Sequence, residues 1–364
     1  MSDKIRALYE LGQSLWYDNI ARDLLQAGAI KKLVENGITG LTSNPAIFQK
    51  AITSGTAYDE QIHQVVARTT EPKAVYEELA VADIRAAADI LRPVFDRTDH
   101  ADGFVSLEVS PFLANETEPT IEEAARLWEW VDRPNLMIKI PATPAGIPAI
   151  EEAIARGLNV NVTLIFSLDL YGQVIEAYIK GLERRAAAGQ PVSNASVASF
   201  FVSRVDTLVD KLLGENNTLK GKAAIANAKM AYQLFKEKFQ GARWEKLQKL
   251  GARVQRPLWA STSTKNPAYP DTIYVDTLIG PHTVNTAPPE TIDAFVDHGV
   301  VALTVEQDVA AARKALQDIA AAGIDMAAVT DELLEDGVQK FAQAFEKLLA
   351  AIGEKASALA AAGD

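Results

Sequence analysis

Cysteine is absent from this chain and histidine is scarce. Among 364 residues there is no cysteine, and the four histidines are His63, His100, His282 and His298. The lack of thiols excludes disulfide bonds, thiol catalysis and thiolate metal sites. The histidines are scattered without the spacing of metal ligands, so we expect no metal centre.

Excess positive charge and long apolar runs are also missing. Lysine and arginine total 36 against 48 aspartate and glutamate residues, a formal net charge of −12. This balance disfavours nonspecific attraction to nucleic acid or anionic lipid. No apolar run reaches the length of about 18 residues that a membrane helix needs, and the opening MSDKIRALYE does not resemble a secretory leader. We therefore expect a soluble cytoplasmic protein without nucleic-acid or membrane partners.

Short strand-like runs alternate with longer helical patterns along the chain. Helical periodicity is clear, for example, in 21–36, 74–95 and 120–131. Alternation of this kind predicts a parallel sheet, and the number of strands favours a closed (β/α)₈ TIM barrel over an open doubly wound sheet. The predicted strands are 14–20, 37–44, 103–110, 135–141, 158–166, 194–202, 256–262 and 272–278.

Two regions lie outside this alternation. Residues 207–255 are charged and helical, which predicts extra helices inserted between strands six and seven. An irregular, proline-rich segment follows Leu278, and residues 306–364 read as C-terminal helices. Length alone also fits two domains, but no low-complexity linker divides the chain, so we expect a single domain over 1–364.

A lysine interrupts the apolar strand NLMIKIP, residues 135–141. Side chains alternate across a strand, so Leu136, Ile138 and Ile140 share one face and Lys139 lies on the other. In a barrel the apolar face meets the surrounding helices. Lys139 is therefore expected to point into the barrel.

The same alternation sends other polar side chains inward, near the carboxyl ends of their strands. Barrel enzymes assemble their sites at this end. On the inner faces we expect Asp18 with Trp16, Asn44 with Thr42, Glu108 with Ser106, and Asn161 with Thr163.

Two interpretations of the lysine are open at this point. Loss of hydration lowers the pKa of a lysine amine, and the neutral amine is a nucleophile that forms Schiff bases with carbonyls. Alternatively, Lys139 only neutralises Glu108 or Asp18 in a structural ion pair. The presence of two carboxylates favours the first, because imine formation and carbon–carbon cleavage both require proton transfers by positioned groups.

Four segments together resemble the transaldolase family: GITGLTSNPAIF from Gly37, NLMIKIPAT from Asn135, NVNVTLIFS from Asn159 and SFFVSRVD from Ser199. They occur in the family's order, and the resemblance extends from the first strand to the seventh. It implies transfer of a dihydroxyacetone unit from sedoheptulose 7-phosphate or fructose 6-phosphate to glyceraldehyde 3-phosphate or erythrose 4-phosphate, in the pentose phosphate pathway, without metal or organic cofactor. Alternatives are a class I aldolase that releases free dihydroxyacetone, and a non-catalytic sugar-phosphate-binding barrel.

The resemblance also implies roles for the residues. Lys139 becomes the imine, and Asp18 is the acid and base at the hydroxyl beside the bond that breaks. Glu108 moves protons through a water molecule that Thr163 positions. The implied substrate-binding residues are Asn44, Asn161 and Ser199 for dihydroxyacetone, and Arg204 with Ser261 for the phosphate.

The chain departs from the shorter family members in three places. Ser263 stands where they have a second arginine, and we expect Lys265 to supply that charge, the alternative being a solvated loop lysine. Phe200 and Ser203 replace the proline and glycine of the Ser-Pro-Phe-Val-Gly-Arg element. The 207–255 insertion resembles the longer bacterial branch, some members of which are fused to glucose-6-phosphate isomerase. The sequence leaves open whether this chain belongs to such a fusion, and whether it is a monomer or a homodimer.

Overall fold

The computed structural model describes residues 2–215 and 217–362. Its strands are all parallel and close into a barrel in chain order, which confirms the predicted (β/α)₈ fold. They are β1 (Gln13–Asp18), β2 (Gly40–Thr42), β3 (Val105–Glu108), β4 (Leu136–Pro141), β5 (Val160–Ile165), β6 (Ser196–Phe201), β7 (Arg256–Ala260) and β8 (Thr283–Ala287).

The eighth strand was predicted in the wrong place. Residues 272–278 contain the short helix α13 (Ile273–Asp276), and β8 lies further on, in the segment expected to be irregular. The apolar residues Tyr274 and Val275 made the first segment resemble a strand, but they are buried as part of a helix. β8 itself reads TVNTA between prolines, and its polar content hid it. It becomes a strand because it pairs with both β1 and β7.

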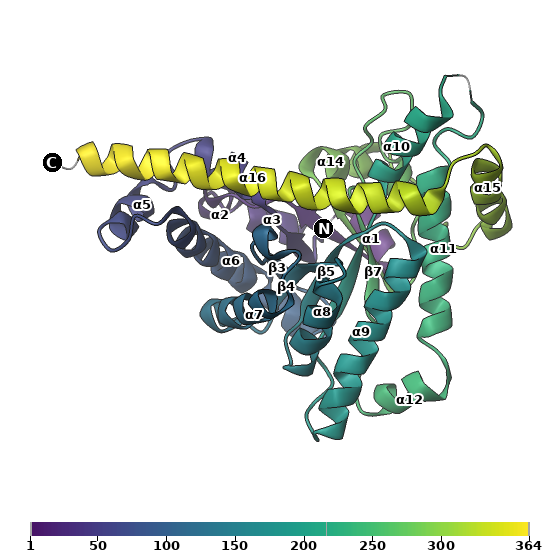
Figure 1. The fold of residues 1–364 in the computed structure, drawn as a ribbon, viewed down its shortest axis with the longest axis horizontal. Coiled ribbons are helices and arrows are strands. Elements are labelled where there is room, and N and C mark those ends of the chain that lie inside the picture. The colour runs from purple at the N-terminus through teal and green to yellow at the C-terminus, as the bar shows by residue number, and fades with distance from the viewer. Residues whose placement is uncertain (1, 216, 363–364) are drawn as a thin grey trace.

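Helices surround the barrel, and the predicted insertion and C-terminal helices are present (Figure 1). The predicted helix 21–36 is divided at Gly28, whose φ of 71° is left-handed. The helices are α1 (Asp3–Glu10), α2 (Arg22–Gln26), α3 (Ala29–Glu35), α4 (Pro45–Thr53), α5 (Asp59–Val66), α6 (Pro72–Arg97), the 3₁₀ helix η1 (Pro111–Leu113), α7 (Thr117–Val131), α8 (Gly146–Ala155), α9 (Leu168–Ala187), α10 (Ser203–Leu213), α11 (Ala223–Lys238), α12 (Gly241–Lys249), α13, α14 (Pro289–His298), α15 (Val309–Ala321) and α16 (Met326–Ala362).

The barrel interior is packed tightly below the carboxyl ends of its strands. Trp16 is fully buried and lies beside Gly40, its register partner in the β1–β2 pair. A Cβ atom at Gly40 would lie 2.4 Å from the indole ring, so only glycine fits there. The indole Nε1 donates to Asp102 over 2.8 Å. Trp16 therefore fills the inner part of the barrel and leaves the carboxyl ends of the strands for polar groups.

The long helix α16 crosses the carboxyl end of the barrel (Figure 1, yellow). It packs against α4, α10 and η1, which follow β2, β6 and β3, and it also contacts β5. Further along, the Lys355 amine lies 2.5 Å from the Asp59 carboxylate and donates to the Gly55 carbonyl. Among the described residues, no helix combines the length and apolar character needed to span a membrane. The course of α16 places its side chains over the candidate site.

Candidate active site

A cavity of about 410 Å³ opens at the carboxyl end of the barrel. Most of the predicted site residues line it: Asp18, Asn44, Lys139, Thr163, Ser199, Arg204, Ser261 and Lys265. The other two predicted residues contact residues that line it, Glu108 through Lys139 and Asn161 through Ser199. The structure therefore brings all the predicted positions into one neighbourhood.

Three polar residues lie in register across three neighbouring strands. Glu108 of β3 is the register partner of Lys139 in β4, which is in turn the partner of Asn161 in β5. Lys139 is 5% exposed, as expected for an inward-facing side chain. Its Nζ lies 3.3 Å from Glu108 Oε2 and donates to the Ser43 carbonyl over 3.1 Å. The ion pair of the structural interpretation is thus present. Lys139 also lines the cavity, which is where the chemical interpretation requires its amine.

The two carboxyl groups near Lys139 are both harder to ionise than usual. Burial raises the pKa of Glu108, and the nearby Lys139 opposes this only in part. Asp18 is partly exposed to the cavity, yet the surrounding protein desolvates its carboxyl and raises its pKa, against the lowering effects of Lys139 and Thr42. Carboxyls with raised pKa values can hold a proton nearer to neutral pH, which suits groups that both give and accept protons.

Asp18 is oriented by a chain of hydroxyl groups. Thr42 Oγ1 donates to Asp18 Oδ1 over 2.7 Å, and the hydroxyls of Thr42 and Thr286 are 2.6 Å apart. A hydroxyl has one hydrogen to donate, so Thr286 is the donor to Thr42 when Thr42 donates to Asp18. Thr286 belongs to β8, and sequence reasoning missed it together with that strand. Asn285 and Thr286 are adjacent polar residues, so TVNTA shows no clean alternation that could have indicated an inward-facing Thr286.

Thr163 lies where β5 departs from regular geometry. The β5–β6 register shifts between Val162 and Ile165, and Leu164 has a left-handed φ of 60°. Such irregularities re-aim side chains and are frequent beside active sites. Thr163 Oγ1 is buried without a hydrogen-bond partner among the described residues. Its hydroxyl is therefore free to hold a ligand or a water molecule.

Asn161 is held on both sides. Its Nδ2 donates to Ser106 Oγ over 3.0 Å, and its Oδ1 accepts from Ser199 Oγ over 2.7 Å.

Asn44 has the capping role that is typical of a residue before proline, because its Oδ1 accepts from the Ile47 amide at the start of α4. It also lines the cavity, so the capping contact holds it in place in the cavity wall.

The candidate phosphate site lies between the ends of β6 and β7. Arg204 is half-buried in the first turn of α10, with its guanidinium 5.1 Å from the centre of the Phe201 ring. Burial lowers its pKa, yet a guanidinium stays charged in proteins. Its Nη1 is buried and has no hydrogen-bond partner within the described part of the chain. A half-buried cation with an unused donor, open to a cavity, suits an anionic group of a ligand.

The loop after β7 completes this region. Ser261 has a left-handed φ of 55°, and its hydroxyl lies 2.9 Å from that of Ser203, the residue that replaces glycine. Lys265 is exposed at the cavity, where Nζ donates to Ser263 Oγ over 2.6 Å. Another lysine, Lys50 of α4, lines the same cavity and was missed from the sequence because it lies in an ordinary helical pattern.

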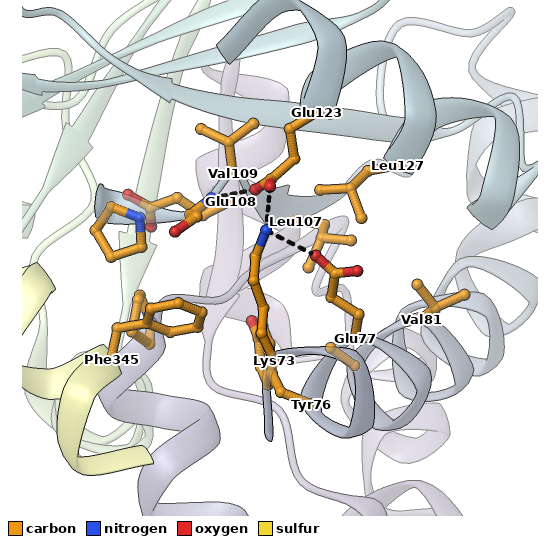
Figure 2. A pocket seen from close by; sticks show the side chains of 14 residues that line it. Lys73, Tyr76, Glu77, Val81, Leu107, Glu108, Val109, Glu123, Leu127 and Phe345 are labelled. Atoms are coloured by element: carbon orange, nitrogen blue, oxygen red, sulfur yellow. Dashed lines mark hydrogen bonds and ion pairs between the residues drawn. The ribbon is translucent and has the colours of Figure 1, made fainter. Parts of the chain in front are cut away.

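Behind Glu108 lies a second, small pocket of about 10 Å³, room for about one water molecule (Figure 2). Lys73 reaches across it with its Nζ 2.5 Å from Glu123 and 3.4 Å from Glu77. The other oxygen of Glu123 accepts from the Ser110 amide over 2.6 Å, two residues after Glu108. This network holds the end of β3, and with it the backbone that carries Glu108.

A lysine beside two desolvated carboxyls at the carboxyl end of a parallel barrel defines a barrel enzyme rather than a structural protein. Comparison with known proteins identifies its kind. The family described as Transaldolase/Fructose-6-phosphate aldolase matches residues 15–352, so the chain belongs to this family.

Full-length relatives agree with this assignment. The chain is 49% identical over 368 residues to a protein named Transaldolase 2 from Nostoc sp., with 96% of this chain and 97% of the relative covered. It is 50% identical over 359 residues to Transaldolase from Acidothermus cellulolyticus, with 97% and 96% covered. It is also 47% identical over 354 residues to Transaldolase from Mycobacterium bovis, with 95% of each chain covered.

Proposed function

We propose that this chain is a transaldolase that carries a dihydroxyacetone unit on Lys139. The observation that carries the proposal is the Lys139–Glu108 pair at 3.3 Å, which lies beside the Asp18 carboxyl at the cavity. Family membership and the names of the relatives support the reaction class. The donors would be sedoheptulose 7-phosphate or fructose 6-phosphate, and the acceptors glyceraldehyde 3-phosphate or erythrose 4-phosphate, as in the pentose phosphate pathway.

The first half of the proposed reaction makes and uses the imine. The neutral Lys139 amine adds to the ketose carbonyl, which gives a carbinolamine. Glu108, protonated and assisted by a water molecule at Thr163, donates a proton to the departing hydroxyl, so that water leaves and an iminium remains. Asp18 then takes the proton of the hydroxyl on the fourth carbon, and the bond between the third and fourth carbons breaks. The electron pair moves into the iminium and forms an enamine.

The second half returns each proton to its source. The enamine carbon bonds to the aldehyde carbon of the acceptor, and Asp18 protonates the new alkoxide. Glu108, now a carboxylate, takes a proton from water as the resulting hydroxide adds to the iminium. The carbinolamine collapses, the new ketose leaves, and Lys139 is again an amine. The protein supplies every acid and base in this sequence, so the mechanism calls for no cofactor.

Binding roles follow from the positions of the remaining residues. Asn44, Asn161 and Ser199 would hydrogen-bond the hydroxyl groups of dihydroxyacetone. Arg204, Ser261 and Lys265 would bind the phosphate at the outer end of the sugar. The length of the donor would then span the cavity from Lys139 to the β6–β7 loops.

Reductive trapping tests this function. Borohydride with fructose 6-phosphate should inactivate the enzyme and leave a three-carbon or sugar adduct on the peptide that contains Lys139, as located by mass mapping. Borohydride without donor should leave activity unchanged. An adduct on another lysine, or none, would contradict the mechanism. A class I aldolase that releases dihydroxyacetone differs in needing no aldose acceptor for turnover, and a non-catalytic barrel would bind the sugar without forming an adduct.

A further inference from the structure

The aromatic ring of Phe341 covers the amine of Lys139. The centre of the ring lies 5.6 Å from Nζ, and the side chain lines the catalytic cavity while only 8% exposed. The other groups around Nζ come from the strand side of the site: the Glu108 carboxylate from β3 and the Ser43 carbonyl just after β2. Phe341 instead comes from α16, the helix that crosses the mouth of the barrel (Figure 1).

The stretch of α16 that carries Phe341 is held in place by contacts one turn before and one turn after it. One turn earlier, a Cβ atom at Gly337 would lie 2.9 Å from Leu164 Cδ2, so the helix lies directly against the irregular part of β5. One turn later, Phe345 packs edge-on against Tyr76 and Phe112, with ring centres 5.2 and 5.3 Å apart (Figure 2 shows Phe345 and Tyr76). Phe341 is therefore a fixed apolar cover and not part of a loose tail.

The proposed reaction contains one intermediate that water can destroy. Once the first aldose leaves, a dihydroxyacetone enamine remains on Lys139. In transfer, its carbon bonds to the acceptor aldehyde. In the competing loss, the same carbon takes a proton from solvent, water adds to the iminium carbon, and free dihydroxyacetone departs as Lys139 regains its amine. The loss requires a proton and a water molecule, and both must reach the intermediate before the acceptor does.

We propose that Phe341 keeps bulk water away from the Lys139-bound intermediate and so favours transfer over release of free dihydroxyacetone. This inference rests on the proposed Schiff base at Lys139. An aromatic face toward the nitrogen also stabilises the cationic iminium, as rings do for other cations. Hydrolysis of the iminium that joins the finished ketose to Lys139 still proceeds, because Glu108 and Thr163 activate the water for this step from the strand side.

The test compares how the intermediate divides between two products. Phe341→Ala and Phe341→Leu are supplied with fructose 6-phosphate and erythrose 4-phosphate, and free dihydroxyacetone is measured against sedoheptulose 7-phosphate. We expect the ratio of dihydroxyacetone to transferred product to rise at least fivefold in Phe341→Ala, with a smaller rise in Phe341→Leu, which keeps apolar bulk. A contribution to folding alone would lower both products together and leave their ratio unchanged.

Leu348→Ala is the matched control. Leu348 is fully buried on the same helix but lines neither the catalytic cavity nor the pocket behind Glu108, so its removal loosens α16 without uncovering Lys139. An unchanged ratio in Phe341→Ala, or an equal rise in Leu348→Ala, overturns the inference. Borohydride trapping is run in parallel. A Lys139 adduct in the parent with an unchanged ratio in Phe341→Ala refutes this inference alone, whereas no adduct in the parent refutes the proposed function and the inference with it.

Discussion

Glu108 and Lys139 are register partners in the β3–β4 pair, and the lysine amine lies 3.3 Å from the glutamate carboxyl. Both side chains are almost completely buried. Removal of one partner from a buried ion pair is strongly destabilising, because it leaves the other charge uncompensated. Burial raises the pKa of Glu108, and the neighbouring Lys139 opposes this only in part. The pair therefore joins a buried amine to a carboxyl that is harder to ionise than usual.

Substitution of the two carboxyls should separate their roles. Asp18→Asn should still form the borohydride-trapped adduct with fructose 6-phosphate, but its turnover should fall about 10²- to 10⁴-fold because carbon–carbon cleavage lacks its base. Glu108→Gln should instead slow formation of the adduct by a similar factor. Rapid-quench trapping measures both rates. Equal trapping rates in the two variants would be incompatible with this division.

The hydroxyl chain from β8 should affect catalysis through Asp18. Thr286→Ala removes the donor to Thr42 and should lower turnover by about tenfold, with little change in the Michaelis constant for either sugar, since Thr286 positions a base and binds no substrate in the proposal. Thr286→Ser keeps the hydroxyl and should restore most of the turnover. Steady-state kinetics of both variants provide the comparison. If serine is as slow as alanine, the lost methyl contact and not the hydroxyl is responsible.

The proposed phosphate site can be tested by replacing its positively charged side chains one at a time. Arg204→Ala should raise the Michaelis constant for fructose 6-phosphate strongly, and Lys265→Ala should raise it several-fold, because each removes a positive charge at the cavity. Turnover of unphosphorylated donors should stay unchanged in Lys265→Ala. Lys314→Ala, an exposed lysine on α15 that is paired with Asp318, serves as the control for loss of charge alone. A parental constant in Lys265→Ala would point to Lys50 as the second cation.

A buried aspartate outside the site should make stability depend on pH. Burial raises the pKa of Asp206 to about 6, although the Ala224 amide and the Tyr274 hydroxyl donate to it. Because the folded value lies above the unfolded one, the folded state binds more protons between these values. The free energy of unfolding should therefore fall as the pH rises from about 4 to about 6, by at most about 3 kcal/mol. Denaturant unfolding of Asp206→Asn across this range should show a smaller fall than the parent, since the raised pKa values of Asp18 and Glu108 contribute in the same direction. A slope equal to that of the parent would assign the whole fall to such other groups.

The space around two glycines, one against Trp16 and one in α9, predicts opposite effects when each is replaced by alanine. Gly40→Ala places a methyl group against the indole and should lower the free energy of unfolding by about 1–3 kcal/mol or more. Gly172→Ala lies inside α9, where the nearest atom to the new Cβ is 4.0 Å away, and should raise stability by about 0.4–1 kcal/mol. Chemical denaturation measures both. A neutral Gly40→Ala would show that the barrel interior can relax around Trp16.

The sequence alone predicted the barrel class, though not its eighth strand, and it predicted most of the residues that the structure brings together at the carboxyl end. Alternation of side chains is local, so the polar residues in otherwise apolar strands could be assigned to the interior without knowledge of the fold. Lys139, Glu108 and Thr163 were found in this way. The carboxyl ends of parallel strands meet at one rim, and this placed the predicted residues together before their distances were known.

Only the tertiary structure decided the features that depend on distant segments. β8 is a strand because β1 and β7 pair with it, whereas its own polar sequence resembles a loop. Thr286 belongs to that strand, so its place in the site could not be predicted either. Phe341 lies in an ordinary amphipathic helix, and nothing in its local pattern indicates that α16 crosses the barrel to reach Lys139 from more than 200 residues away in the chain. Such contacts are set by how whole elements pack, which local periodicity does not encode.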